Sequence, residues 1–111
     1  MMGIKALISP WDYDHFAKTW SKLLDFKKRT GFTNEQIREK SGASWPAVSK
    51  IFRGDEPEPT VTCQKNMDKI IKAYHINPDW IIGKSQKMLS DRKALTAAEK
   101  IIMKRTKEKQ I

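Results

Sequence analysis

The residues whose types and spacing indicate a definite chemistry lie between Thr33 and Gly54. Thr33 and Ser44 stand where helix caps are needed, because a hydroxyl oxygen can accept a hydrogen bond from a free N–H group of a first helical turn. Gly42 lies between them and permits the positive φ of a tight turn. Two short helices joined in this way cross at about 90–120°, so the second can enter the major groove of DNA while the first lies across the backbone. The segment therefore predicts a helix-turn-helix unit.

Apolar residues in the same segment have the spacing that holds two such helices together. Ile37 in the first helix, and Val48 and Ile51 in the second, are predicted to face inward and to fix the crossing angle. The capping-box spacing from Thr33 to Gln36 supports the start of the first helix.

Side chains that would carry catalysis or bind a metal are scattered. Cys63 is the single cysteine, and His15 and His75 lie far apart in the sequence. We find no carboxylate pair, no nucleophile–base arrangement, no phosphate-binding glycine loop and no metal-ligand spacing. We therefore expect a protein that is not an enzyme and that takes no cofactor and no metal.

The chain is strongly basic. Its 111 residues include 22 Lys and Arg against 13 Asp and Glu, a formal net charge of +9, which suits a polyanionic partner. Residues 84–111 alone hold nine basic and three acidic residues, a difference of +6. We therefore divide the chain into a DNA-binding domain over 1–83 and a basic C-terminal extension over 84–111. The charge run 104–109 fits two interpretations, a disordered solvated end and a source of non-specific DNA affinity.

Composition also indicates the cellular compartment in which the protein acts. Apolar residues make up 39% and charged residues 32%, which is typical of one globular domain with one core. No apolar run approaches the roughly 18 residues that span a bilayer, and Met1–Pro10 lacks the cleavage pattern of a secretory signal. The lone Cys63 cannot form an internal disulfide. These features favour a cytoplasmic protein with no membrane partner.

The spacing of apolar residues is helical nearly throughout, and we find no alternating run typical of a strand. Phe16, Trp20 and Leu23 follow the i, i+4, i+7 spacing of an amphipathic helix that Ser9-Pro10 would begin. The stretch 84–92 is predicted to be loose. We expect an all-α fold, a compact five-helix bundle with a central helix-turn-helix, plus a basic C-terminal extension that forms one more helix. The predicted helices cover about 10–30, 34–40, 45–53, 62–74, 79–82 and 97–106.

The segment resembles the Cro/repressor-like, phage-repressor type family of helix-turn-helix regulators. The resemblance rests on Phe32-Thr33, on Gly42 nine residues further on, on the inward Val48, and on the closing Ser49-Lys50-Ile51-Phe52-Arg53-Gly54. It covers about residues 16–83 and ends in Asn77-Pro78-Asp79-Trp80-Ile81-Ile82-Gly83.

Two residues depart from the family's pattern. Arg38 stands where the family usually has alanine or glycine, at the point where the two helices nearly touch, and Ser41 stands at a commonly apolar position. A long arginine stem can lie along the surface with its charge in solvent.

The resemblance implies that the helix starting near Trp45 lies in the major groove. Lys50 can donate to O6 and N7 of guanine, and an apolar side chain can contact the thymine methyl group. A helix N-terminus with its free N–H groups suits a phosphate. The residues implied to contact bases are Trp45, Pro46, Ser49 and Lys50, and those implied to contact phosphates are Thr33, Asn34, Ser44 and Arg53.

Two functions from different classes fit these residues. The first is a sequence-specific DNA-binding transcriptional regulator, a repressor, which binds double-stranded DNA as a homodimer because one recognition helix reads few bases. Candidate dimer surfaces are Trp80-Ile81-Ile82 and the final helix with Leu95, Ile101 and Ile102. The alternative is an antitoxin-like or adaptor module whose main partner is another protein, with DNA binding secondary. Arg38 and the Trp45-Pro46 pair keep this alternative open.

Overall fold

The computed structural model describes residues 7–91, 93 and 95–109. Residues 1–6 of the predicted DNA-binding domain, and residues 92, 94, 110 and 111 of the basic extension, lie outside this description. The described part forms six helices and contains no strand, which confirms the predicted all-α class. The helices are α1 (Tyr13–Thr30), α2 (Asn34–Ser41), α3 (Trp45–Ile51), α4 (Val61–Tyr74), α5 (Pro78–Ile81) and α6 (Ala97–Lys109).

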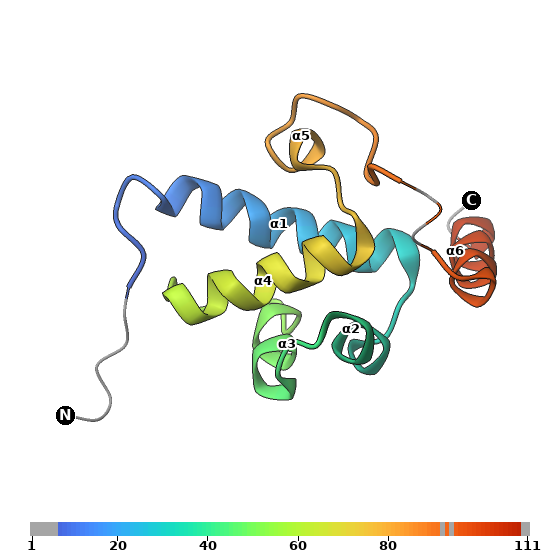
Figure 1. Ribbon diagram of the computed structural model, residues 1–111, viewed down its shortest axis with the longest axis horizontal. Coiled ribbons are helices and arrows are strands. Elements are labelled where there is room, and N and C mark those ends of the chain that lie inside the picture. The colour runs from blue at the N-terminus through green and yellow to red at the C-terminus, as the bar shows by residue number, and fades with distance from the viewer. Residues whose placement is uncertain (1–6, 92, 94, 110–111) are drawn as a thin grey trace.

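The two longest helices, α1 and α4, run side by side through the middle of the molecule (Figure 1). Helices α2 and α3 lie on the far side of α4 from α1, and α6 packs near the C-terminal end of α1. None of the helices in the described ranges is long and apolar enough to cross a membrane. The arrangement leaves α3 at one edge of the molecule, with one side against α4 and the other side open.

The core lies between α1, α4 and the two helices of the predicted helix-turn-helix. It includes three aromatic rings, Phe26, Phe32 and Tyr74, whose centroids lie 5.0–5.9 Å apart. Burial raises the pKa of the Tyr74 hydroxyl well above its usual range. The buried apolar residues are Phe16, Leu23, Phe26, Phe32, Ile37, Ala43, Val48, Ile51, Met67, Ile70, Tyr74, Ile76, Trp80, Ile81, Leu89 and Leu95.

Helix α1 starts later than the Ser9-Pro10 pair predicts. The Ser9 hydroxyl donates to Oδ2 of Asp12 at 2.8 Å, and the Asp12 N–H donates to the Ser9 carbonyl at 3.0 Å. These two contacts close a turn ahead of the helix, so the first helical residue is Tyr13. The Asp12 carboxylate accepts from Ser9 and makes no side-chain cap bond with the helix.

The predicted looseness of 84–92 is wrong for its described residues. The Asn77 N–H donates to the Met88 carbonyl at 2.8 Å, and the Ser90 N–H donates to the His75 carbonyl at 2.7 Å. Leu89, between these two bonds, is buried. Met88 and Leu89 are the two adjacent apolar residues of this polar stretch, and two are too few to show a periodicity. Their contacts nevertheless hold the segment against the core.

Helix α6 forms from the predicted capping box and packs against the body of the protein. The Glu99 N–H donates to the Thr96 hydroxyl at 3.1 Å, and the Thr96 N–H donates to Glu99 Oε1 at 2.9 Å. Leu95, just before the helix, is buried. The helix ends at Lys109, one turn beyond the predicted limit.

The C-terminal end of α1 and α6 approach closely at Gly31. A Cβ atom added to Gly31 would collide with the Thr106 side chain, whereas one added to Gly42 would meet nothing within 4 Å. Both glycines have the same left-handed backbone, with φ of 75° and ψ of 8°. An alanine would therefore meet the same backbone strain at both positions, and only at Gly31 would its Cβ also collide with a neighbour.

This pair provides a test of how α6 packs. Gly42→Ala should cost about 1 kcal/mol of unfolding free energy, the strain of a side chain in the left-handed region. Gly31→Ala should cost a further ~1–3 kcal/mol because α6 must shift. Urea denaturation of the two variants measures the difference. Equal losses would contradict the close contact between Gly31 and α6, and Thr106→Ala should recover part of the extra loss.

Candidate nucleic-acid interface

Helix α2 begins with the capping box that the sequence predicts. The Gln36 N–H donates to the Thr33 hydroxyl at 3.1 Å, and the Thr33 N–H donates to Gln36 Oε1 at 2.8 Å. At the other end, the Gly42 N–H donates to the Arg38 carbonyl at 2.9 Å. Residues within the segment therefore cap both ends of this eight-residue helix.

The turn into α3 is held by polar side chains. The Ser41 hydroxyl accepts from the Ala43 N–H at 3.2 Å, which gives a role to the serine that departs from the family's pattern. The Ser44 hydroxyl caps α3 by accepting from the Ala47 N–H at 3.3 Å. The Ser44 N–H in turn donates to Oδ1 of the buried Asn66 on α4, at 3.4 Å. A side chain on α4 therefore fixes the position where α3 begins.

Two contacts fix the inner side and the end of α3. Val48 and Ile51 are fully buried and pack in the core with Ile37 of α2. The Trp20 Nε1–H on α1 donates to the Ile51 carbonyl at 2.8 Å, which satisfies one of the free carbonyls of the last turn. The helix ends at Ile51, earlier than Gly54 predicts, and Phe52 follows as its cap.

The outer side of α3 carries all the residues that the family resemblance assigns to base contacts. Trp45, Pro46, Ser49 and Lys50 are exposed, and their i, i+1, i+4, i+5 spacing puts them on one side of the helix. Trp45 exposes 51% of its surface, so it is not the packed aromatic that a first helical turn often holds. The structure therefore brings these four side chains together on an open surface.

The residues assigned to phosphates are placed less uniformly. Thr33 and Ser44 use a hydroxyl oxygen as a cap acceptor, which leaves each O–H free to donate to another group. Asn34 is half-buried, and its Oδ1 has no hydrogen-bond partner in the described part of the chain. An amide oxygen cannot donate, so a phosphate contact here must come from the amide nitrogen. Arg53 is exposed, and its Nε lies 3.8 Å from Oδ2 of Asp55.

Arg38, the other departure from the family's pattern, lies beside the exposed tryptophan. Its guanidinium carbon is 5.8 Å from the centre of the Trp45 ring, within the range of a cation–π contact. Its Nη2 lies 3.9 Å from Glu39 Oε1, a long surface ion pair. The positive charge of Arg38 thus stands next to the residues of the open surface.

An ion pair connects α6 to α2. Lys40 Nζ lies 2.6 Å from Glu99 Oε1, and the two side chains are only 23% and 15% exposed. Burial acts to raise the pKa of Glu99, but the ammonium of Lys40 and the hydrogen bonds with Thr96 outweigh it and lower the pKa. The carboxylate is therefore charged at neutral pH and connects α6 to α2.

Cysteine, histidine and acidic side chains elsewhere in the chain are the other candidates for nucleophiles or metal ligands. Burial raises the pKa of the Cys63 thiol, which opposes formation of the nucleophilic thiolate. No three histidine, cysteine or acidic side chains in the described ranges are grouped closely enough to hold a metal ion.

Sequence reasoning missed the two side chains that hold α3 from outside its own segment, Asn66 and Trp20. A signal for Asn66 was available, because it lies four residues before Ile70 and shares the apolar side of α4 with Ile70 and Tyr74. A polar residue in an apolar stripe must find a buried hydrogen-bond partner. Trp20 carries no comparable signal, since its ring fits the apolar pattern of α1.

Comparisons with protein-family models, with curated proteins and with solved structures find no match to this chain.

The bond from Trp20 to α3 can be tested by a conservative substitution. Trp20→Phe should lower the unfolding free energy by about 1–2 kcal/mol because the Ile51 carbonyl loses its donor. Hydrogen exchange of the α3 amides should rise by more than that of α4. Trp11→Phe, at a side chain that is 85% exposed, is the matched control and should change stability by less than about 0.5 kcal/mol. A similar loss in both variants would contradict a special role for Trp20.

The contribution of the Lys40–Glu99 pair should depend on pH. Glu99→Gln keeps an oxygen for the capping box but removes the charge, and should cost about 1 kcal/mol at pH 7. Because the folded pKa lies below the ordinary value of 4.5, the charged form stabilises the fold above pH 4.5 and this benefit is lost as the pH falls further. Thermal unfolding of both proteins at several pH values should show the difference disappearing in acid. A difference that persists there would contradict the ion-pair explanation. The exposed Glu108→Gln is the control.

Proposed function

We propose that this protein is a sequence-specific DNA-binding transcriptional regulator, a repressor, which inserts α3 into the major groove of double-stranded DNA. It acts in the cytoplasm and as a homodimer. The observation that carries this proposal is the contrast between the two sides of α3. Val48 and Ile51 are fully buried, whereas Trp45, Pro46, Ser49 and Lys50 are exposed together on the other side.

The chemistry of the open side fits base edges. A lysine ammonium donates to the acceptors of guanine, and an indole and a pyrrolidine ring offer apolar contact for the thymine methyl group. The serine hydroxyl can donate or accept. The set holds one cation and no amide, so the affinity gained from direct base reading is modest, and contacts to phosphates must supply much of the binding energy.

The surroundings of α3 favour a polyanion. Arg38 lies beside the open side of α3, and Arg53 follows its C-terminal end. The whole chain carries a net charge of +9. The hydroxyls of Thr33 and Ser44 each keep a free donor at the start of a helix, where the helix dipole also attracts an anion.

A homodimer would present two recognition helices about one helical turn apart, ~34–36 Å. The candidate dimer surfaces are smaller than the sequence predicts, because Trp80, Ile81 and Leu95 belong to the core of the chain itself. Ile82 and Ile101, which are 40% and 52% exposed, are the candidate residues that stay available to a second copy.

The roles of Trp45 and Lys50 can be tested on duplexes selected from a random library by the wild-type protein. Trp45→Ala and Lys50→Ala should each weaken binding to the selected duplex by ~1–3 kcal/mol, and should change binding to a scrambled duplex much less. Lys69→Ala, an exposed lysine on α4, is the matched control. Fluorescence anisotropy measures all four proteins. Unchanged affinity in both α3 variants would remove these residues from the interface.

A modified base makes the test specific to the groove. Replacing guanines of the selected site by 7-deazaguanine removes the N7 acceptor of the major groove and leaves the minor groove intact. Wild-type protein should lose affinity, whereas the Lys50→Ala variant should lose no more, because the bond is already absent. Additive losses would show that Lys50 does not contact N7.

A further inference from the structure

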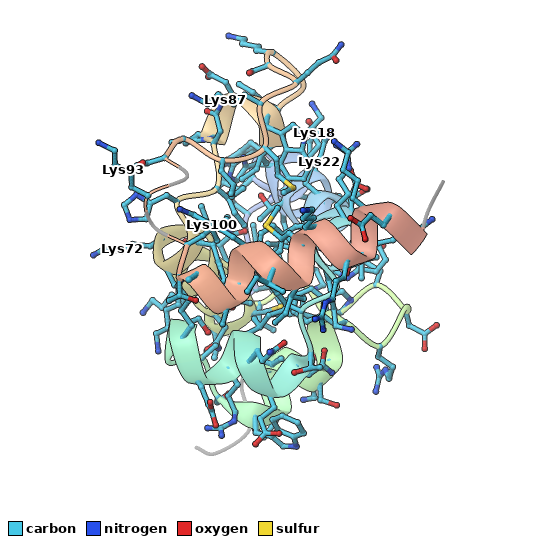
Figure 2. The ribbon with its side chains drawn as sticks, turned by 90° about the vertical axis from the view of Figure 1, so that its right-hand side faces the viewer. Lys18, Lys22, Lys72, Lys87, Lys93 and Lys100 are labelled. Atoms are coloured by element: carbon cyan, nitrogen blue, oxygen red, sulfur yellow. The ribbon has the colours of Figure 1, made fainter. Side chains whose placement is uncertain are left out.

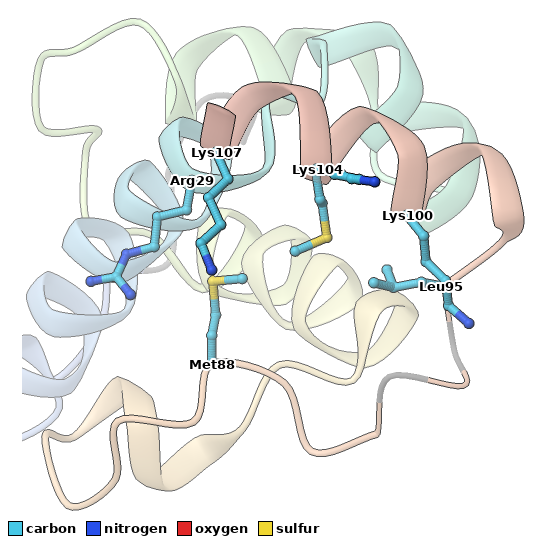
Figure 3. Close-up of a pocket in the computed structure, with 7 residues that line it drawn as sticks. Arg29, Met88, Leu95, Lys100, Lys104 and Lys107 are labelled. Carbon is cyan, nitrogen blue, oxygen red and sulfur yellow. The ribbon is translucent and has the colours of Figure 1, made fainter. Parts of the chain in front are cut away.

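A cavity of about 770 Å³ lies between the C-terminal end of α1, α6 and Met88 (Figure 3). Its volume is within the range of small-molecule sites, about 300–1,000 Å³. The apolar part of its lining comes from Met88, Leu95 and Met103. Methionine is flexible and polarisable, so two methionines can adapt to an apolar ligand of irregular shape.

Among the described residues, every polar side chain of the lining is cationic. They are Arg29 and three lysines of α6, Lys100, Lys104 and Lys107. Their i, i+4, i+7 spacing puts the lysines on one side of the helix. Arg29 is paired with Asp25 at 3.1 Å, whereas the three lysines make no ion pair with any described residue. Like charges at this spacing repel one another, so a bound anion would relieve the repulsion.

These lysines face away from the proposed DNA-binding surface. In Figure 3, α2 lies on one side of α6, while Lys107 extends from its other side and points across the cavity toward Met88. Lys104 lies along the helix at the rim of the cavity. Figure 2 shows the same relation from another direction, with Lys100 on the side of α6 opposite α2. A duplex docked on α3 therefore leaves this cationic cluster open for another anion.

We propose that this cavity binds a small amphipathic carboxylate. Its apolar chain would lie on Met88, Leu95 and Met103, and its carboxylate would pair with the ammonium group of Lys107, which extends over the cavity, with the charge of Lys104 at the rim adding to the attraction. The match is one of charge and polarity: four cations stand around an apolar floor, with no acidic residue among the described lining residues. This site is independent of the proposed DNA-binding function, since it uses none of the residues of α3.

Octanoate is a suitable probe, with octanol and acetate as matched compounds that keep only the chain or only the charge. The readout is the NMR spectrum of the full chain labelled with ¹³C at the methionine methyl groups, assigned with Met88→Leu and Met103→Leu. Octanoate should shift the signals of Met88 and Met103 in a saturable way. The signal of Met67, fully buried elsewhere in the core, should stay in place. Octanol and acetate should each bind at least tenfold more weakly.

Charge-removing variants complete the test. Lys104→Gln/Lys107→Gln should weaken octanoate binding at least tenfold, while Lys65→Gln/Lys69→Gln, two exposed lysines of α4, should leave it unchanged. Equal binding of octanol and octanoate would overturn the proposal, and so would shifts that do not saturate. Binding to vesicles that contain phosphatidylglycerol, with none to monomeric octanoate, would also overturn it in favour of a membrane surface.

Discussion

Helix α3 has seven residues, which is far too short to be stable alone in water. Its existence and direction therefore depend on the burial of Val48 and Ile51, and at each end on one hydrogen bond with a side chain of another helix. Trp20 provides the bond at the C-terminal end from α1, and Asn66 provides the one at the N-terminal end from α4. The open side of α3 is therefore oriented by contacts with α1 and α4, the two longest helices of the described chain.

Different sides of the last helix, α6, make different contacts. One side of α6 carries Glu99, whose ion pair with Lys40 fixes it to α2. Another carries the lysines that line the cavity against Met88 and Leu95. The positive charge of 84–111 is therefore arranged in part on one side of a packed helix, where it lines the cavity. A disordered tail would spread the same charge through solvent.

Local features were predictable, whereas long-range contacts were not. The caps at Thr33, Ser44 and Thr96 depend on partners within three residues, so the sequence alone predicts them. The bonds from Trp20 and Asn66 join residues 31 and 22 positions apart. The apolar stripe of α4 indicates that Asn66 needs a buried partner, but no local pattern identifies the partner of either residue. The cavity is hidden for the same reason, because its lining comes from separate segments. The exposure of Trp45 and Lys50 agrees with the role that the family resemblance implies, and DNA binding itself stays a prediction.

The central claim is that α3 and its neighbours bind duplex DNA with a preference for sequence. The most direct measurement is a fluorescence-anisotropy titration of the wild-type protein with the fragment upstream of its own gene and with a scrambled duplex, across several salt concentrations. We expect tighter binding to the upstream fragment, saturating at two chains per site, with affinity falling as salt rises. Equal affinity for the two duplexes at every salt concentration, or no binding at low salt, would contradict the account.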